Sequence, residues 1–265
     1  MNQHILDLAQ RLIDGVIAVL PQPRPGAAEA AATKIVAHRG NCDPKSVENS
    51  LDAFAQCDEL GVWGIELDIQ WSKDDVAVVS HDPDLARVYR LADHNIAEHD
   101  FADLKSRIPE LPRLEEIITR YGGKRHLMIE LKRETLKPRH FKLLEAMLED
   151  LEPVRDYHLL SLEFDFIEDI PAHLARAMLM VAEINTKSIA AGIVQRHWPA
   201  CAGHYLLFTR KIRRQLRQQN KQFGVGFVTS KNGLYREINR GADWIFTNDA
   251  ARLQSCLEQL KRAGN

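Results

Sequence analysis

Short apolar runs recur along most of the chain and alternate with segments whose apolar residues are spaced as on one face of a helix. Runs of four to eight apolar residues bounded by polar residues are typical of buried strands, and i, i+3, i+4 spacing is typical of amphipathic helices. We therefore predict eight strands, at Ile35–His38, Gly64–Trp71, Leu127–Leu131, His158–Leu162, Ala177–Ala182, Tyr205–Phe208, Gly224–Val228 and Trp244–Thr247.

Helix-length segments lie between most of these strands, for example Ser50–Leu60, Arg139–Leu151, Arg210–Asn220 and Gly233–Arg240. Strands separated by helices form βαβ units and a parallel sheet. Eight such units are the number that closes a (β/α)8 TIM barrel, a fold of about 250 residues. The predicted fold class is therefore α/β, as one TIM barrel.

One further apolar run, Val76–Ser80, does not fit this alternation. Only residues 72–75 separate it from the preceding strand, whereas a parallel crossover needs about a dozen residues. We therefore predict an extra β-hairpin arm that folds back on Gly64–Trp71. Such an arm brings His81 close to Glu66 and Asp68.

The segments outside this pattern lie at the start and after the hairpin. Apolar residues between Ile5 and Leu20 have helical spacing, and a proline-rich stretch follows. We predict an N-terminal amphipathic helix and linker over residues 1–33 and the barrel domain over residues 34–265. The helix would cover the domain or a second copy of the chain, the latter giving a homo-oligomer. Residues 82–121 are predicted to form a long loop that covers the site.

Composition narrows the class of protein. The net charge is −2, so no overall positive field attracts nucleic acid, and nucleic acid is excluded as a partner. The first twenty residues carry charges and show no secretory pattern, and no segment is a transmembrane candidate. The four cysteines have no CxxC spacing. We expect reduced thiols, a cytoplasmic location and a small-molecule partner.

Charged residues follow the apolar runs of three predicted strands. Glu66 and Asp68 are two positions apart and so point to the same face, and Glu130 and Lys132 repeat this spacing on the next barrel strand. Active sites of TIM barrels lie at the C-terminal ends of the strands. Three carboxylates there suit a divalent cation, Mg²⁺ or Ca²⁺ first and Mn²⁺ as a further candidate. The alternative is a set of buried ion pairs between these carboxylates and the cations Lys132 and Arg39.

Two histidines at strand ends favour the metal site over that alternative. A histidine titrates near neutrality, so His38 and His81 can exchange protons with a substrate as an acid and a base. Arg39 and Lys132 supply positive charge for an anionic substrate. Together these residue types predict metal-assisted cleavage of a phosphodiester.

The chain also resembles the glycerophosphodiester phosphodiesterases, a family of the phosphatidylinositol-phospholipase-C-like barrel group. Several short motifs carry this resemblance in the same order, over roughly residues 34 to 250. They are Val36-Ala-His-Arg-Gly40, Glu48-Asn49-Ser50, Glu66-Leu-Asp-Ile69, His81-Asp82-Pro83, Leu111-Pro112-Arg113-Leu114-Glu115-Glu116, Ile129-Glu-Leu-Lys132 and Ile245-Phe-Thr-Asn-Asp249.

The resemblance implies a role for each matching residue. It implies that Glu66, Asp68 and Glu130 bind the metal, that His38 and His81 form the acid–base pair, and that Arg39 and Lys132 hold the phosphate. It places Glu48 in or beside the site. It also implies attack of a neighbouring substrate hydroxyl on phosphorus, which gives a cyclic phosphate that is then hydrolysed.

The second half of the chain departs from the family pattern, notably at Phe227-Val228-Thr229-Ser230 and Thr247-Asn248-Asp249-Ala250. These positions line the substrate end of the pocket. The expected activity is hydrolysis of glycerophosphodiesters to glycerol 3-phosphate and an alcohol. The alternatives are a lysophospholipase-D-like activity on a longer lipid, or a catalytically weak binding protein on the same barrel.

Overall fold

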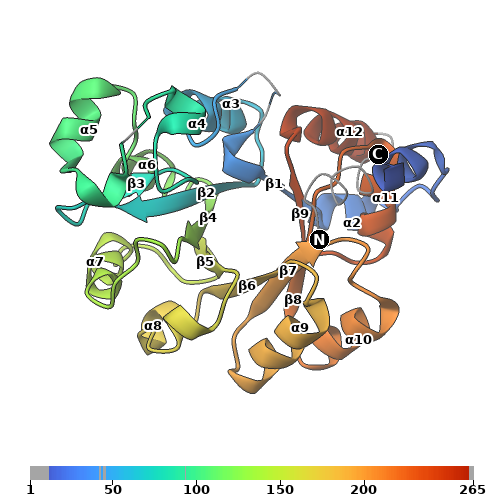
Figure 1. Cartoon of the computed structure of the whole chain (residues 1–265). Helices are drawn as coiled ribbons and strands as arrows, with labels where there is room; N and C mark the ends of the chain where they lie inside the picture. Colours follow the sequence, from blue (N-terminus) through green and yellow to red (C-terminus); the bar gives the residue numbers. More distant parts are fainter. Residues whose placement is uncertain (1–11, 42, 44–45, 93, 263–265) are drawn as a thin grey trace.

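Eight strands run parallel and close on themselves in the computed structural model, which describes residues 12–41, 43, 46–92 and 94–262 (Figure 1). Closure comes from β1, where Val36 pairs with Phe246 of β9 on one side and with Gly64 of β2 on the other. The predicted TIM barrel is therefore confirmed. Its strands are β1 Lys34–Ala37, β2 Gly64–Trp71, β4 His126–Leu131, β5 Tyr157–Ser161, β6 Met178–Ala182, β7 Ala200–His204, β8 Gln222–Gly226 and β9 Trp244–Thr247.

The ninth strand, β3 Ala77–Val79, is the predicted hairpin arm. It pairs antiparallel with the end of β2, with Val79 opposite Ile69. The pairing continues for one more residue, because the Ser80 N–H donates to the Asp68 carbonyl at 3.0 Å. His81 therefore begins where the carboxylate face of β2 ends.

Two apolar clusters follow from the alternation of side chains along the strands. Residues such as Ile35 and Leu127 face outward and pack on the helices, together with Phe54 and Leu114. The barrel interior is filled by a smaller cluster that includes Val36, Met128, Leu160, Leu179, Trp244 and Phe246. The outer helices are α2 Ala27–Ala32, α3 Leu51–Glu59, α6 Leu114–Tyr121, α7 His140–Met147, α8 Ala172–Ala175, α9 Thr186–Gln195, α10 Arg210–Gln218, α11 Lys231–Asn239 and α12 Ala250–Arg262.

Residues 82–121 do not form the predicted covering loop. They contain α4 Ala86–Tyr89, η2 Ile96–Glu98, α5 Phe101–Arg107 and the barrel helix α6, and Figure 1 shows α4 and α5 on the side of the barrel that carries β3. Their apolar side chains bury one another against Val78 in a separate small cluster. Its members lie on short elements with irregular spacing, so no periodic pattern revealed them. They are Leu85, Ile96, Leu104, Ile108 and Leu111.

The predicted strand Tyr205–Phe208 is wrong, because β7 lies just before it. The sequence of β7, Ala-Cys-Ala-Gly-His, consists mostly of small residues and lacks the large β-branched or aromatic residues that are typical of a strand. The close approach of β6 explains them: a Cβ at Gly203 would lie 2.6 Å from the Ala182 carbonyl oxygen. Small residues are thus required where two strands pack this closely.

The cysteine prediction is wrong in part. Cys201 and Cys256 carry free thiols, as expected, but Cys57 on α3 is disulfide-bonded. The sequence contains no CxxC motif, but cysteines outside such a motif can still be brought together by the fold and form a disulfide.

Residues 12–19 are helical, and the predicted N-terminal helix before residue 12 lies outside the described residues. Ile13 and Ile17 pack against the barrel core, and the Asn232 side chain donates to the Ala18 carbonyl at 2.8 Å. This part of the helix therefore covers the domain. Among the described helices, none has the length and apolar character needed to cross a membrane.

Candidate active site

Three carboxylates converge at the C-terminal ends of β2 and β4. Asp68 and Glu130 are direct partners in the sheet register, and Glu66 precedes Asp68 on the same face of β2. One oxygen of each carboxylate lies within 4.8 Å of an oxygen of the other two. The structure therefore brings together the three carboxylates that the sequence predicts as metal ligands.

Two of these carboxylates also have cationic partners. The Lys132 ammonium lies 2.7 Å from Asp68 Oδ1 and contacts Glu130 Oε1, and Arg39 Nε lies 3.4 Å from Asp68 Oδ2. The ion pairs considered as an alternative to a metal site are thus present at Asp68 and Glu130.

Glu66 differs from its neighbours. No lysine or arginine side-chain nitrogen lies within 4.0 Å of it in the described part of the chain. Its Oε2 accepts the backbone N–H of Arg39 at 2.7 Å and lies 3.9 Å from His38 Nε2.

The pKa values of these groups reflect this uneven pairing. Burial, then the charges of Asp68 and Glu130, raise the pKa of Glu66 well above its ordinary value. Burial and Asp68 likewise raise the pKa of Glu130, despite Lys132. At Asp68 burial acts in the same direction, but Lys132 and Arg39 outweigh it and the pKa is lowered. The cluster therefore holds more negative charge than its lysine and arginine balance, and the excess is centred on Glu66.

This charge excess fits a divalent cation. Mg²⁺, Ca²⁺ and Mn²⁺ prefer oxygen ligands, and carboxylates are the ligands on which most of their protein sites are built. Glu66, Asp68 and Glu130 offer three such ligands from two adjacent strands. The residues present therefore suit the metal that the sequence predicts.

The turn after β1, η1 His38–Gly40, aims a backbone N–H at Glu66. Arg39 takes a positive φ of 54°, and Gly40 one of 71°. A Cβ at Gly40 would lie 2.5 Å from the ring of Phe54, so only glycine fits both the angle and the space. This tight turn places both His38 and Arg39 next to the carboxylates.

His38 is held in place by residues that follow β8 and β9, on the side of β1 opposite to β2. Its Nδ1 lies 2.6 Å from Asn248 Oδ1, and its ring centroid is 4.5 Å from that of Phe227. Burial, with a contribution from the charge of Arg39, lowers the pKa of His38 to about 4. The ring is therefore neutral at pH 7. If the Asn248 oxygen accepts the Nδ1 proton, the free lone pair is on Nε2, the atom nearer Glu66.

His81 is positioned by Asp82 and by Arg87 of α4, in the segment of residues 82–121. Its Nδ1 lies 2.7 Å from Asp82 Oδ1, and its carbonyl accepts from Gln70 at 3.0 Å. Arg87 of α4 donates to Asp82 Oδ2 at 2.5 Å. Arg87 also donates to Glu48, so the segment that carries α4 supports the site from one side.

Glu48 lies beside the carboxylate cluster, where it binds two arginines. Arg39 donates to its Oε1 at 2.9 Å, and Arg87 donates to both of its oxygens, at 2.6 and 3.0 Å. Burial raises the pKa of Glu48, but Arg87 and Arg39 outweigh it, and the pKa is lowered. Glu48 is thus an ionised residue that orients Arg39.

Sequence reasoning gave no individual role to four residues of this region: Arg87, Asn49, Asn248 and Phe227. The Asn49 amide donates to Asp68 Oδ2 at 2.9 Å, and Asn248 bonds to His38. Both asparagines lie inside motifs that carried the family resemblance, so a signal existed for them. Arg87 lies in the segment of residues 82–121, where the apolar residues have no regular spacing, and no sequence motif marks it.

Comparison with known proteins identifies the family. Residues 38–247 match the model of the "Glycerophosphoryl diester phosphodiesterase family". The chain is 37% identical over 112 residues to a glycerophosphodiester phosphodiesterase of Caldanaerobacter subterraneus subsp. tengcongensis. This match covers 38% of the chain and 45% of that protein, so the chain matches about half the length of this relative.

Solved structures resemble the whole barrel. A glycerophosphodiester phosphodiesterase from Thermotoga maritima has a TM-score of 0.72 at 21% identity, covering 84% of this chain and 97% of that one. An Oleispira antarctica phosphodiesterase, solved in complex with the product sn-glycerol-3-phosphate, has a TM-score of 0.68 at 20% identity, covering 88% and 100%. At these identities the likeness shows the fold.

The uneven pairing of Glu66 and Asp68 predicts opposite effects of two isosteric substitutions in metal-free protein. Because the folded-state pKa of Glu66 is raised, its ionisation opposes folding, and Glu66→Gln should raise the free energy of unfolding at pH 7 by about 1 kcal/mol. This gain should vanish below the ordinary carboxyl pKa of 4.5. Asp68→Asn should lower the free energy of unfolding by about 3 kcal/mol, because it leaves Lys132 and Arg39 without their shared carboxylate.

Urea unfolding with a chelator present, repeated from about pH 2 to pH 8, measures both effects. The loss in Asp68→Asn should stay constant above the ordinary aspartate pKa of 3.8 and shrink below it, because the lowered pKa of Asp68 stabilises the fold only where the side chain is ionised. If both substitutions changed the free energy of unfolding in the same direction at pH 7, the conclusion that Glu66 lacks a compensating cation while Asp68 has two would be wrong.

Proposed function

Because the chain belongs to the glycerophosphoryl diester phosphodiesterase family, a family of phosphoric diester hydrolases, we propose that it hydrolyses glycerophosphodiesters to glycerol 3-phosphate and an alcohol. The observation that carries this proposal is the convergence of Glu66, Asp68 and Glu130. That the Oleispira antarctica phosphodiesterase was solved with sn-glycerol-3-phosphate as its product supports the choice of substrate class.

A divalent cation at Glu66, Asp68 and Glu130 would supply positive charge to the phosphate oxygens. Lys132 contacts two of these carboxylates, so it would adjoin the same oxygens and contribute a second cation. Arg39 is held by Glu48 and Asp68 at the edge of the cluster. We propose that Arg39 and Lys132 hold the phosphate from that position.

The two histidines would move the protons. His38 is neutral at pH 7, so it can accept the proton of the substrate hydroxyl next to the phosphate as that oxygen attacks phosphorus. The bond from phosphorus to the leaving alcohol oxygen then breaks, and the donating role falls to His81. A cyclic phosphate results. Water opens it when the two histidines exchange roles, which yields glycerol 3-phosphate.

A lysophospholipase-D-like activity is the second candidate, and the far side of the barrel mouth supports it. Ile184 and Leu206 lie two residues after β6 and β7, Phe227 directly follows β8, and all three are exposed. Phe227 also contacts His38. Exposed apolar side chains at the C-terminal ends of three neighbouring strands suit a ligand with an acyl chain.

A substrate panel tests the proposed function. Purified protein with Mg²⁺, Ca²⁺ or Mn²⁺ should release glycerol 3-phosphate from glycerophosphocholine or glycerophosphoethanolamine, measured by a coupled dehydrogenase assay. Absence of turnover on every deacylated diester would contradict the first candidate.

The same panel, extended to lysophosphatidylcholine, separates the second candidate. A higher kcat/KM on the acylated substrate would favour it. Phe227→Ala should then lower that kcat/KM about 30-fold, because burial of a phenyl ring contributes about 2 kcal/mol. The loss on the deacylated substrates should be smaller, because there Phe227 acts only through its contact with His38.

Substitution of either histidine tests the proton-transfer roles. His38→Ala and His81→Ala should each lower kcat by about 10² to 10⁴, the usual contribution of general acid–base catalysis. His173→Ala, which removes an exposed histidine from α8, is the matched control and should retain full activity. Unchanged kcat in His38→Ala would exclude the proposed mechanism.

Metal binding should be visible without turnover. Mg²⁺, Ca²⁺ or Mn²⁺ at about 100 times its dissociation constant should stabilise the fold by about 2.7 kcal/mol and raise the melting temperature. Glu66→Gln and Glu130→Gln should lose most of this rise. Glu163→Gln, a carboxylate after β5 outside the cluster, should keep it. An equal rise in all four proteins would assign the metal effect to another place.

A further inference from the structure

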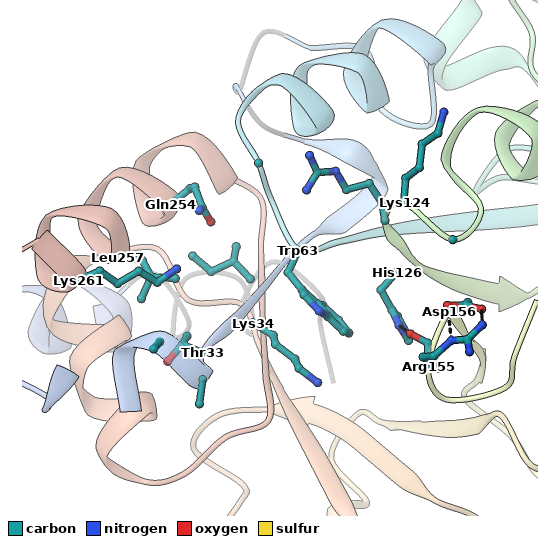
Figure 2. A pocket seen from close by; sticks show the side chains of 16 residues that line it. Thr33, Lys34, Trp63, Lys124, His126, Arg155, Asp156, Gln254, Leu257 and Lys261 are labelled. Atoms are coloured by element: carbon teal, nitrogen blue, oxygen red, sulfur yellow. Dashed lines mark hydrogen bonds and ion pairs between the residues drawn. The ribbon is translucent and has the colours of Figure 1, made fainter. Parts of the chain in front are cut away.

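A cavity lies at the opposite end of the barrel from the candidate active site. Its volume is about 460 Å³, which is in the range of small-molecule sites. Lys34 and His126 line it at the N-terminal ends of β1 and β4, the strands that carry His38 and Glu130 at their other ends (Figure 2). Trp63, directly before β2, forms its centre, and Lys261 of α12 faces it from the other side.

The lining of this cavity is strongly basic. Five of its side chains are lysine or arginine and one is a carboxylate, Asp156. The chain as a whole has a net charge of −2. The lining therefore carries a local excess of positive charge that the chain as a whole does not have. The basic residues are Lys34, Lys124, Arg125, Arg155 and Lys261.

The pairing of these cations shows which of them are available. Arg125 binds Asp58, and Lys261 lies 3.1 Å from Glu258. Arg155 uses Nε and one terminal nitrogen on Asp156. Neither Lys34 nor Lys124 has a carboxylate within 4.0 Å in the described part of the chain. Lys124 donates to the Arg120 carbonyl at 3.1 Å, whereas the Lys34 ammonium has no hydrogen-bond acceptor among the described residues and lies 4.6 Å from the ring centroid of Trp63. The charge of Lys34 is thus the least compensated in the cavity.

The inner wall is fixed and uncharged. Trp63 stacks on His126 with ring centroids 4.3 Å apart. His126 in turn bonds the Arg155 carbonyl at 3.0 Å and His158 at 2.7 Å. Burial, and to a lesser degree Lys34, lower the pKa of His126 to about 4, so it is neutral at pH 7. Because Trp63 already contacts Lys34 and His126, a stacked aromatic ligand is disfavoured, and recognition must come from charge.

We propose that this cavity binds a small anion through its phosphate group, held by Lys34, Lys261 and Arg155. Ammonium and guanidinium groups form strong charge-assisted hydrogen bonds to phosphate oxygens. An anion here would supply the counter-charge that Lys34 lacks. The group has two sources, inorganic phosphate and a phosphate monoester such as glycerol 3-phosphate. The second source rests on the proposed function, because it is the product of that reaction.

Trp63 provides a reporter that separates this cavity from the active site. An anion that draws Lys34 away from the indole changes the emission of Trp63, and the difference between wild-type protein and Trp63→Phe isolates that signal. Inorganic phosphate and sn-glycerol 3-phosphate are titrated separately, with potassium chloride at matched ionic strength as the control. Calorimetry on the same proteins counts the anions bound.

A saturable change in Trp63 emission is expected with phosphate and not with chloride. Lys34→Gln and Lys261→Gln should each weaken binding about tenfold, or remove one bound equivalent in calorimetry. Lys124→Gln is the matched control, because Figure 2 shows Lys124 directed away from Trp63, and it should bind as wild type. Tighter binding of sn-glycerol 3-phosphate than of phosphate identifies the monoester as the ligand, and equal binding identifies the phosphate group alone.

Equal affinity in wild type, Lys34→Gln and Lys261→Gln, or no change beyond that of chloride, would overturn the proposal. Its failure is distinguishable from failure of the proposed function. The cavity is tested by binding, and the proposed function by release of glycerol 3-phosphate. Either result can stand without the other.

Discussion

Crowding of three carboxylates, two buried and one partly buried, at one end of the barrel is the constraint on which the site depends. Carboxylates removed from water repel one another strongly unless a cation lies among them. Lys132 and Arg39 compensate the charge of Asp68, and Lys132 alone compensates part of the charge of Glu130. Neither cation pairs with Glu66. Such an arrangement opposes folding while it is unbalanced. It is explained most simply as a site completed by a divalent cation.

Most of the surrounding structure serves to hold this cluster. The strand pairing fixes Asp68 against Glu130, the η1 turn directs a backbone N–H to Glu66, and Asn49 holds Asp68. Glu48 and Arg87 form an outer layer that fixes Arg39 and Asp82. The basic cavity around Trp63 lies at the N-terminal ends of β1 and β4, so the barrel carries a carboxylate cluster at one end and a group of cations at the other.

Much of the fold and of the site could be predicted from the sequence, because closed parallel barrels repeat one strand–helix unit and place strand ends together. The hairpin arm followed from a connection too short for a crossover. The strand β7 escaped prediction, because close packing against β6 demands small residues there. The cluster around Leu85 and Ile96, and with it Arg87, escaped because its apolar residues lie on short elements without a period. Pairing of Lys132 with Asp68 and Glu130 was considered only as an alternative to a metal site, and the structure contains it within that site.

The most direct test of the account is a crystal structure of the protein soaked with Mn²⁺, with data collected for anomalous scattering. The account predicts one strong anomalous peak within about 2.0 to 2.6 Å of oxygens from Glu66, Asp68 and Glu130. Absence of a peak at these carboxylates, with Lys132 still bound between Asp68 and Glu130, would contradict it.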